Sequence, residues 1–472
     1  MLFRSKAASL IRSGLHVSCI YSESPYKPDH SVNSFYNDWM EAASDAFALR
    51  GVIEGFYGRP WTHQNRLIAI DYFANFGMNL YIVGPKDAAW QRTDWRSSFS
   101  DTFIAEAAEL VTKGKMKGIE VTFSISPGLS VVYSSVADRK LLLDKFSQLA
   151  ECGVTHFCLM WDDIDWDLQD PNDIEKYTYI EDGQSEFSNW IYECLIAKNP
   201  DSKFSICPMI YWGRGSNAYI NQIGKNLHPD INIMWTGRQI RSEYIDSVDA
   251  QTFARDAKRK PFYWDNFPVN NLSLKHELHL GPVVNRENNL SQHTVGLVAN
   301  PMNQFWASLL PLSTVGRYLS SPSSYSPEKA WEISLTELFP KREDRDAMRT
   351  FSECFLSSPI QNAGNPRLTE IFTHYRNSDA CAIDATKNLI HEIEKSYARI
   401  ISVDFNWPDF AIEVRPWLDK FLKLREILML MIDESVGILD IEQRNSKIQE
   451  IIDTDRFIVC REQIEEFLYE SL

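Results

Sequence analysis

The sequence predicts an α/β protein with a (β/α)8 TIM barrel at residues 48–311, followed by an all-α helical domain at residues 312–472. Three observations predict this fold. Short apolar runs alternate with amphipathic stretches over about 260 residues, a usual length for such a barrel. No GxGxxG motif follows the first run, which disfavours a doubly wound open sheet, the alternative fold. Beyond about residue 312 the strand-like runs end and helical periodicity dominates.

The barrel strands are predicted from eight short apolar runs. They are rich in β-branched and aromatic residues, as expected for strands that are buried on both faces. Amphipathic stretches separate most of them, which is the order that a (β/α)8 barrel requires. The runs are residues 51–53, 80–83, 121–125, 157–160, 204–206, 231–234, 262–263 and 295–298.

The predicted helices show apolar residues at spacings of three and four. In residues 103–118, Phe103, Ala107 and Leu110 fall on one face, and Gly118 suits the end of the helix. The same pattern occurs at residues 137–153 in the barrel region, and at residues 384–402, 415–443 and 456–472 in the helical domain.

Charge and hydropathy disfavour two classes of function. The chain of 472 residues has 48 Lys and Arg against 64 Asp and Glu, a formal charge of −16. An acidic surface opposes non-specific binding to nucleic acid and gives no support for docking on an anionic membrane. No apolar run reaches the ~18 residues that a transmembrane helix needs. We therefore expect neither nucleic-acid binding nor membrane insertion.

Cysteine usage and the N-terminus bear on the compartment. The eight cysteines form no CxxC pair, so we interpret them as reduced thiols, which favours the cytoplasm or another reducing compartment. Residues 1–47 are predicted to be an extension before the first domain. Arg4, Lys6 and Arg12 give it a weak resemblance to a transit peptide, and a poorly ordered extension is the alternative. The sequence leaves the compartment open.

Polar residues follow nearly all of the eight runs. In a (β/α)8 barrel the active site forms at the carboxyl ends of the strands, so these residues are predicted to converge. Their Asp, Asn, Tyr, Trp and Lys side chains suit a sugar-sized polar pocket with aromatic walls. The segments are residues 54–61, 84–87, 126–128, 161–165, 207–211, 235–237, 264–266 and 300–301.

The carboxylates Asp162 and Asp163 follow the fourth run directly. Consecutive strand residues point to opposite faces, so one carboxylate can enter the barrel mouth while the next reaches the rim. Two carboxylates in a partly apolar pocket should titrate apart, leaving one as an anion and one as an acid. Glycosidic bond cleavage requires this division.

Two other interpretations of the acidic segment are open. One is a solvated acidic loop or a helix N-terminus. The other is a divalent metal site that includes Asp165 and Asp167. The segment lacks the glycine and terminal Glu of an EF-hand, and no His lies beside it, so we predict no metal site and no cofactor.

Seven motifs, in order over about 260 residues, resemble glycoside hydrolase family 84, which contains protein O-GlcNAcases and bacterial β-N-acetylglucosaminidases. The combination of EGFYGRPW with a downstream DDID is highly specific. The motifs are GVIEGFYGRPW at 51–61, GPKD at 84–87, ISPG at 125–128, WDDID at 161–165, WTG at 235–237, WDN at 264–266 and NPM at 300–302.

The resemblance implies a retaining exo-β-N-acetylglucosaminidase that uses substrate assistance, an exception to the scheme with a carboxylate nucleophile. The 2-acetamido oxygen of the sugar would attack the anomeric carbon and form an oxazoline. Asp162 would orient the acetamido N–H and take up its developing charge. Asp163 would protonate the leaving oxygen and then activate water.

The same motifs imply the substrate-binding residues. Gly55 and Lys86 would hydrogen-bond sugar hydroxyls, and Asn300 would reach a ring hydroxyl. Tyr211, Trp264 and Asn266 would line the acetamide pocket and the sugar-binding wall, and Tyr57 belongs to the same set.

The sequence departs from the family pattern at two places. Asn271 stands where the family usually has an Asp that bonds the 4- and 6-hydroxyls of the sugar, so a charge-assisted hydrogen bond is lost. The family's common TEY is here Met209-Ile210-Tyr211, which keeps only the Tyr.

We therefore predict a hydrolase of terminal β-linked GlcNAc whose substrates are GlcNAc-bearing glycoproteins, including O-GlcNAc on Ser or Thr, or glycans. The alternative is a GlcNAc-binding barrel with weakened catalysis, which the Asn at position 271 makes conceivable. The sequence does not indicate the oligomeric state.

Overall fold

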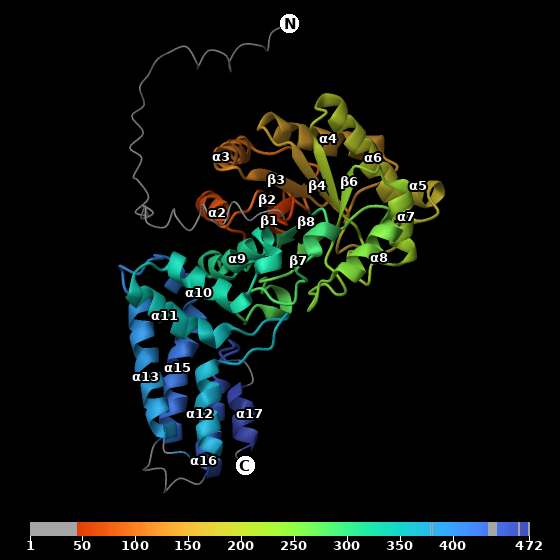
Figure 1. Cartoon of the computed structure of the whole chain (residues 1–472). Helices are drawn as coiled ribbons and strands as arrows, with labels where there is room; N and C mark the ends of the chain where they lie inside the picture. The colour runs from red at the N-terminus through yellow and green to blue at the C-terminus, as the bar shows by residue number, and fades with distance from the viewer. Residues whose placement is uncertain (1–44, 378, 380, 433–440, 461–462, 471–472) are drawn as a thin grey trace, which may run out of the picture. The chain divides into compact units, whose positions relative to one another are not determined.

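Eight parallel strands close into a barrel in the order in which they occur along the chain (Figure 1). Each strand pairs with the next, and β8 pairs with β1 to complete the ring. The prediction of a (β/α)8 barrel is therefore confirmed, and every predicted run lies within or overlaps its strand. The strands are β1 (Leu49–Glu54), β2 (Leu80–Val83), β3 (Glu120–Ile125), β4 (His156–Met160), β5 (Lys203–Cys207), β6 (Ile231–Trp235), β7 (Phe262–Asp265) and β8 (Gly296–Ala299).

The computed structural model describes residues 45–472, apart from residues 378, 380, 433–440, 461–462 and 471–472. The predicted extension at residues 1–47 therefore lies outside the described residues except at its end. There Phe47 is buried against Tyr318, with ring centroids 5.5 Å apart, and its N–H donates to the carbonyl of Leu319. This end of the extension packs on the last barrel helix.

Helices surround the barrel, and their ends follow local sequence signals. Ser100 caps α3 by accepting the N–H of Phe103, and Gly118 ends it with φ of +74°, a conformation that glycine adopts without strain. The barrel helices are α2 (His63–Asn75), α3 (Asp101–Lys117), α4 (Val136–Glu151), α5 (Pro171–Lys176), α6 (Ile180–Lys198), α7 (Ala218–Asn226), α8 (Ser247–Ala257) and α9 (Phe305–Ser320).

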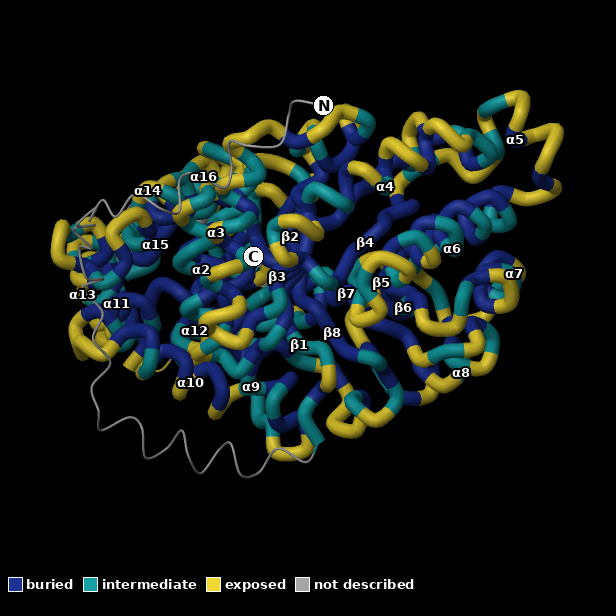
Figure 2. The backbone as a smooth tube through the Cα atoms, turned by 90° about the horizontal axis from the view of Figure 1, so that it is seen from above, coloured by how far each residue is buried: buried dark blue, intermediate teal, exposed yellow. Residues whose placement is uncertain are grey.

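The strands divide the apolar residues between two cores. On β4, Cys158 and Met160 point into the barrel, while Phe157 and Leu159 pack outward against the helices. This alternation follows from the two-residue period of a strand. Figure 2 shows the strands as buried tube, with exposed segments on the outer faces of the helices.

The last barrel helix crosses the boundary that the sequence suggests. α9 contacts both β1 and β8, so it occupies the eighth helix position of the barrel. Because it continues to Ser320, the division expected between residues 311 and 312 lies inside it. We propose the end of α9 as the division between the barrel and the helical region.

The described residues after α9 form helices joined by irregular segments, in agreement with the predicted helical domain. Here α13 packs against α11 and α15, and their buried faces carry residues such as Leu389, Phe351 and Phe421. Its helices are α10 (Pro327–Leu338), α11 (Arg342–Ser352), α12 (Pro366–Arg376), α13 (Cys381–Ile400), α14 (Phe410–Glu413), α15 (Arg415–Ile432), α16 (Ile441–Ile452) and α17 (Gln463–Glu470).

Two predicted helices differ from the structure. Residues 456–460 are irregular, and α17 begins only at Gln463, where the sequence pattern predicts a helix from residue 456. Cys460 has φ of +57°, which a right-handed helix does not allow. The predicted segment 415–443 contains α15 and the start of α16, and residues 433–440 between them lie outside the described residues.

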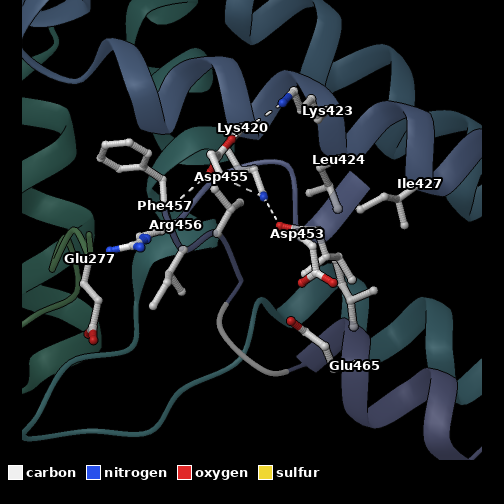
Figure 3. Close-up of a pocket in the computed structure, with 14 residues that line it drawn as sticks. Glu277, Lys420, Lys423, Leu424, Ile427, Asp453, Asp455, Arg456, Phe457 and Glu465 are labelled. Carbon is white, nitrogen blue, oxygen red and sulfur yellow. Dashed lines mark hydrogen bonds and ion pairs between the residues drawn. The ribbon is translucent and has the colours of Figure 1, made fainter. Parts of the chain in front are cut away.

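A cavity of about 290 Å³ lies beside α15, between that helix and residues 452–459 (Figure 3). Lys420 and Lys423 reach from α15 toward Asp455, with Nζ–O distances of 3.4 and 3.5 Å. Lys420 also donates to the carbonyl of Ile451. Its lysines therefore bond to groups of the chain itself.

In the described part of the chain, no helix is long and apolar enough to cross a membrane.

Candidate active site

The side chains that face into the barrel continue beyond the strand ends. On β4 the inward positions are Cys158 and Met160, and the next residue of the same parity is Asp162. On β7 the inward positions are Phe262 and Trp264, and the next is Asn266. The two-residue period of the strands thus brings polar side chains to the carboxyl end of the barrel, where such barrels bind their ligands.

A cavity of about 480 Å³ opens among these strand ends. All ten residues that the sequence nominates for the site line it. This size is in the range of small-molecule binding sites. Its lining comprises Gly55, Tyr57, Lys86, Asp162, Asp163, Cys207, Tyr211, Thr236, Ile240, Arg241, Trp264, Val269, Asn266, Asn271, Leu272, Ser273 and Asn300.

Asp162 is buried in the wall of the cavity, with only 4% of its surface exposed. Its Oδ2 atom accepts a 2.5 Å hydrogen bond from the ammonium of Lys86, which is itself buried. Among the described residues its Oδ1 atom has no hydrogen-bond partner. A buried carboxylate oxygen without a donor is costly, so this atom is a natural acceptor for a ligand N–H or O–H.

Asp163 lies at the exposed rim of the cavity and is held by two tyrosines. The hydroxyl of Tyr57 donates to Oδ2 at 2.7 Å, and the hydroxyl of Tyr211 donates to Oδ1 at 2.8 Å. The guanidinium of Arg92 donates to its backbone carbonyl at 2.5 Å. Its φ of +57° turns the chain so that consecutive aspartates face different parts of the cavity.

These contacts set the protonation state of Asp163 at the rim of the cavity. Partial burial raises the pKa of Asp163. The charge of Lys86, the hydrogen bonds from Tyr57 and Tyr211 and the charge of Arg92 together lower it by more. The net pKa is below the ordinary value. Burial, together with the Asp163 charge and hydrogen bond, raises the pKa of both tyrosines, so they remain neutral donors. In the free site Asp163 is therefore an anion.

A chain of amide hydrogen bonds forms the wall opposite the aspartates. Asn300 accepts from the backbone N–H of Gly55 at 3.2 Å and donates to Oδ1 of Asn266 at 2.9 Å. The indole N–H of Trp264 donates to the same Asn266 oxygen at 3.0 Å. Asn266 in turn donates to the carbonyl of Ile240 at 2.7 Å. Each polar group of this wall is thus fixed in orientation before a ligand arrives.

Gly55 is required by a close approach. A Cβ atom at this position would lie 2.3 Å from the ring of Trp264, well inside van der Waals contact. The ammonium of Lys86 lies 5.5 Å from the centroid of the same ring. The glycine, the indole and the lysine therefore pack as one unit beneath the cavity.

Sequence reasoning missed several residues of the site. Arg92 gives no signal in the sequence because it lies in an irregular loop, yet it bonds Asp163 and lies 3.4 Å from Ser126. Thr236 and Cys207 belong to segments that the sequence nominates as strand ends. Ile240, Arg241, Val269, Leu272 and Ser273 come from loops whose course only the fold determines.

The described residues contain no group of three or more His, Cys, Asp or Glu side chains arranged to hold a metal ion. The aspartate side chains of the acidic segment do not converge on a common point. Asp162 bonds Lys86 and Asp163 bonds two tyrosines, while Asp165 and Asp167 are exposed.

Comparison with known proteins supports the architecture and identifies the family. The model of the beta-N-acetylglucosaminidase (NAGidase) family matches residues 50–353. Protein O-GlcNAcase of Rattus norvegicus and that of Mus musculus are each 30% identical over 279 residues, which is 58% of this chain and 30% of theirs. The chain thus spans about a third of the length of these curated relatives.

Solved structures extend the likeness to the helical region. A mutant of the Thermobaculum terrenum O-GlcNAc hydrolase superimposes with a TM-score of 0.82 and 29% identity over 90% of this chain and 94% of that one. CpGH84B superimposes with a TM-score of 0.77 at 22% identity over 90% of this chain and 77% of that one, and supports the fold alone. By the family match, which spans more than half of the sequence, the chain belongs to the beta-N-acetylglucosaminidase family, glycoside hydrolase family 84.

Proposed function

We propose that this protein is a retaining exo-β-N-acetylglucosaminidase that hydrolyses terminal β-linked GlcNAc by substrate assistance. The observation that carries the proposal is the buried Oδ1 atom of Asp162, which lacks a donor among the described residues and lies on the wall of the cavity. An acetamido N–H supplies the missing donor. The ammonium of Lys86 donates to Oδ2, so Oδ1 is the oxygen that remains for the ligand.

In this mechanism Asp162 orients the acetamide so that its carbonyl oxygen attacks the anomeric carbon. Bond formation to that carbon and loss of the leaving oxygen give an oxazoline, and the acetamido nitrogen becomes positively charged. The Asp162 carboxylate stabilises this charge. An internal nucleophile held in place reacts without the entropy cost of a bimolecular step.

Asp163 is proposed to protonate the leaving oxygen and then to take a proton from water. The free site holds it as an anion through two tyrosine hydroxyls. A bound sugar excludes water, which raises the pKa of a carboxylate, and draws the Tyr211 hydroxyl to the acetamide, which removes one donor from the anion. Both changes favour the protonated form that a general acid needs.

The remaining wall is proposed to recognise one terminal sugar. Asn300, Asn266 and the backbone of Gly55 present fixed polar groups, and Trp264 offers an apolar surface. Tyr57 and Lys86 complete the contacts. Asn271, 7% exposed, takes the position that would face the 4- and 6-hydroxyls, and its amide can both donate and accept there.

The named relatives indicate the substrate class. The rat and mouse proteins are called protein O-GlcNAcases and the bacterial structure an O-GlcNAc hydrolase. We propose that O-GlcNAc on Ser or Thr of proteins is among the substrates of this chain.

The test is hydrolysis of an aryl β-GlcNAc beside the matching aryl β-glucoside. The glucoside has no acetamide, so substrate assistance predicts turnover of the first and none of the second. Hydrolysis of both at similar rates would exclude the mechanism. Binding of GlcNAc with no hydrolysis would instead favour the alternative, a sugar-binding barrel with weakened catalysis.

A further inference from the structure

One cation on the wall of the catalytic cavity is not used by the proposed reaction. Arg241 lies four residues after the WTG segment at the end of β6 and lines the cavity. Within the described ranges its guanidinium makes no hydrogen bond and no ion pair, whereas Arg238 on the same loop pairs with Asp246 and Asp249. A half-buried arginine with five donors and no acceptor is suited to a ligand anion.

The surroundings of Arg241 place it on the side of the leaving group. Burial lowers the pKa of Arg241, and electrostatic interactions with Glu277 and Tyr211 partly oppose this shift. Tyr211 donates to Asp163, the proposed acid on the leaving oxygen. A group attached to that oxygen therefore lies beside Asp163 and Tyr211, within the neighbourhood of Arg241.

Two exposed apolar side chains line the same cavity as Arg241. Ile240 precedes Arg241 and is 44% exposed, and Leu272 on the loop after β7 is 59% exposed. Leu272 has φ of +55°, which is strained for a leucine and holds this residue at the cavity lining. Asn266 donates to the carbonyl of Ile240 and so fixes the loop that carries Ile240 and Arg241. The cavity lining thus combines apolar contact with a guanidinium that has no ion-pair partner among the described residues.

The acids near this rim do not neutralise it. Asp162 and Asp163 are the two carboxylates among the described residues that line the cavity, and they bond Lys86 and two tyrosines. Glu277 lies outside the cavity lining, and its Oε2 atom lies 3.2 Å from Nε2 of His279. A charge at Arg241 is therefore available to a group that enters from the leaving-group side.

We propose that Arg241, flanked by Ile240 and Leu272, selects aglycones that carry a carboxylate, so that the preferred substrate is GlcNAc on a Ser or Thr with an acidic residue nearby. This inference rests on the proposed hydrolase activity and extends it to the polypeptide. The guanidinium can donate two N–H bonds to the carboxylate oxygens, and the apolar pair packs on the neighbouring peptide.

The experiment uses two synthetic O-GlcNAc-serine peptides that differ only by Asp or Asn two residues from the sugar. We expect the wild-type kcat/KM to favour the Asp peptide by about tenfold, the value of one hydrogen-bonded charge pair. Arg241→Gln should bring the ratio close to one, and Arg241→Lys should retain part of it. Added salt should reduce the wild-type preference.

The matched control is Lys275→Gln, which removes the same charge from an exposed position on the loop of Leu272 that does not line the cavity. It should leave the Asp-to-Asn ratio at the wild-type value. A wild-type ratio of one, or a ratio that Arg241→Gln does not change, would overturn the inference.

A second arm distinguishes another source of negative charge. Aryl GlcNAc with and without a 6-O-sulfate tests whether Arg241 serves the sugar instead. If Arg241→Gln changes only the rate of hydrolysis of the sulfated compound, the inference about the aglycone is wrong. If the wild type hydrolyses none of these compounds, the proposed function itself fails, and the two failures are thereby separate.

Discussion

The barrel mouth and the helical region each bring side chains from several elements together, but with different results. At the mouth, polar residues from several strands converge on a cavity, and Asp162 keeps one oxygen without a partner among the described residues. In the helical region aromatic residues converge on a dry core, where the ring of Trp407 lies 4.5 Å from that of Phe339 and 5.7 Å from that of Phe410. The first arrangement leaves a cavity between its side chains, and the second is filled by the rings of the chain itself.

Among the contacts that join the two regions, one involves a carboxylate at a helix end. Glu413 at the end of α14 accepts the backbone N–H of Trp306, in the first turn of the barrel helix α9, at 2.8 Å. A carboxylate there satisfies an unpaired N–H and interacts favourably with the helix dipole. The comparison predicts that substitutions at the mouth change turnover with little effect on stability, and that substitutions at this contact do the reverse.

The largest effect is expected at the aspartates. Asp163→Asn removes the proposed acid, so kcat for substrates with poor leaving groups should fall by about 10²–10⁴-fold while binding persists. An activated aryl leaving group needs less protonation and should be less affected. Thermal unfolding checks that the variant is folded. Full activity toward a poor leaving group would contradict the assignment.

A substitution behind the cavity should have the next largest effect. Gly55→Ala places a methyl group against the ring of Trp264, so the ring or the Gly55 backbone must move. Overpacking of this kind costs about 1–3 kcal/mol, which corresponds to a loss of roughly 10–100-fold in kcat/KM if it falls on sugar binding. Steady-state kinetics with an aryl GlcNAc measures it. Unchanged kcat/KM would show that the wall is not part of the site.

Glu413→Gln tests the other side of the comparison. Burial raises the pKa of Glu413 to about 7, and the three backbone N–H donors of residues 305–307 oppose the shift. The folded state therefore binds a proton that the unfolded chain releases near its ordinary pKa. The stability due to this proton is complete below that value and is lost as pH rises through about 7.

The neutral glutamine should therefore remove up to ~3 kcal/mol of pH dependence between about pH 4.5 and 7. Denaturant unfolding across this range measures the slope. Glu343→Gln, at an exposed position in the first turn of α11, is the control and should keep the wild-type slope. A wild-type slope in Glu413→Gln would show that the carboxylate does not titrate at the contact.

The smallest effect is a shift in the pH profile. The hydrogen bond from Tyr211 lowers the pKa of Asp163, so Tyr211→Phe should raise that pKa. Asp163 must be protonated to act as the acid, so the basic limb of kcat/KM should move to higher pH. Tyr192→Phe, whose hydroxyl lies 3.4 Å from Asp230, is the control and should leave the limb in place. A limb that moves to lower pH would reverse the assigned role.

The sequence predicts the barrel well because each strand is a local pattern. The eight runs lie within or overlap their strands, and β2 has the bounds of its run. The polar strand ends follow from the same period, and the family motifs that contain or adjoin them implied ten residues that line the cavity. Strand three is an exception, since residues 126–128 do not line the cavity. For the helical region the sequence predicted helices but not how they pack. The pattern of one helix does not specify which other helices it contacts.

The sequence by itself determined the order of the strands, the residues that end them and the alternation that brings Asp162 inward, because these depend on neighbouring residues and a fixed backbone period. Only the tertiary structure decided that two tyrosines hold Asp163, that Arg241 reaches the cavity and that Glu413 meets α9. Those contacts join residues far apart in the chain, and they form only when the barrel closes and the loops take one course.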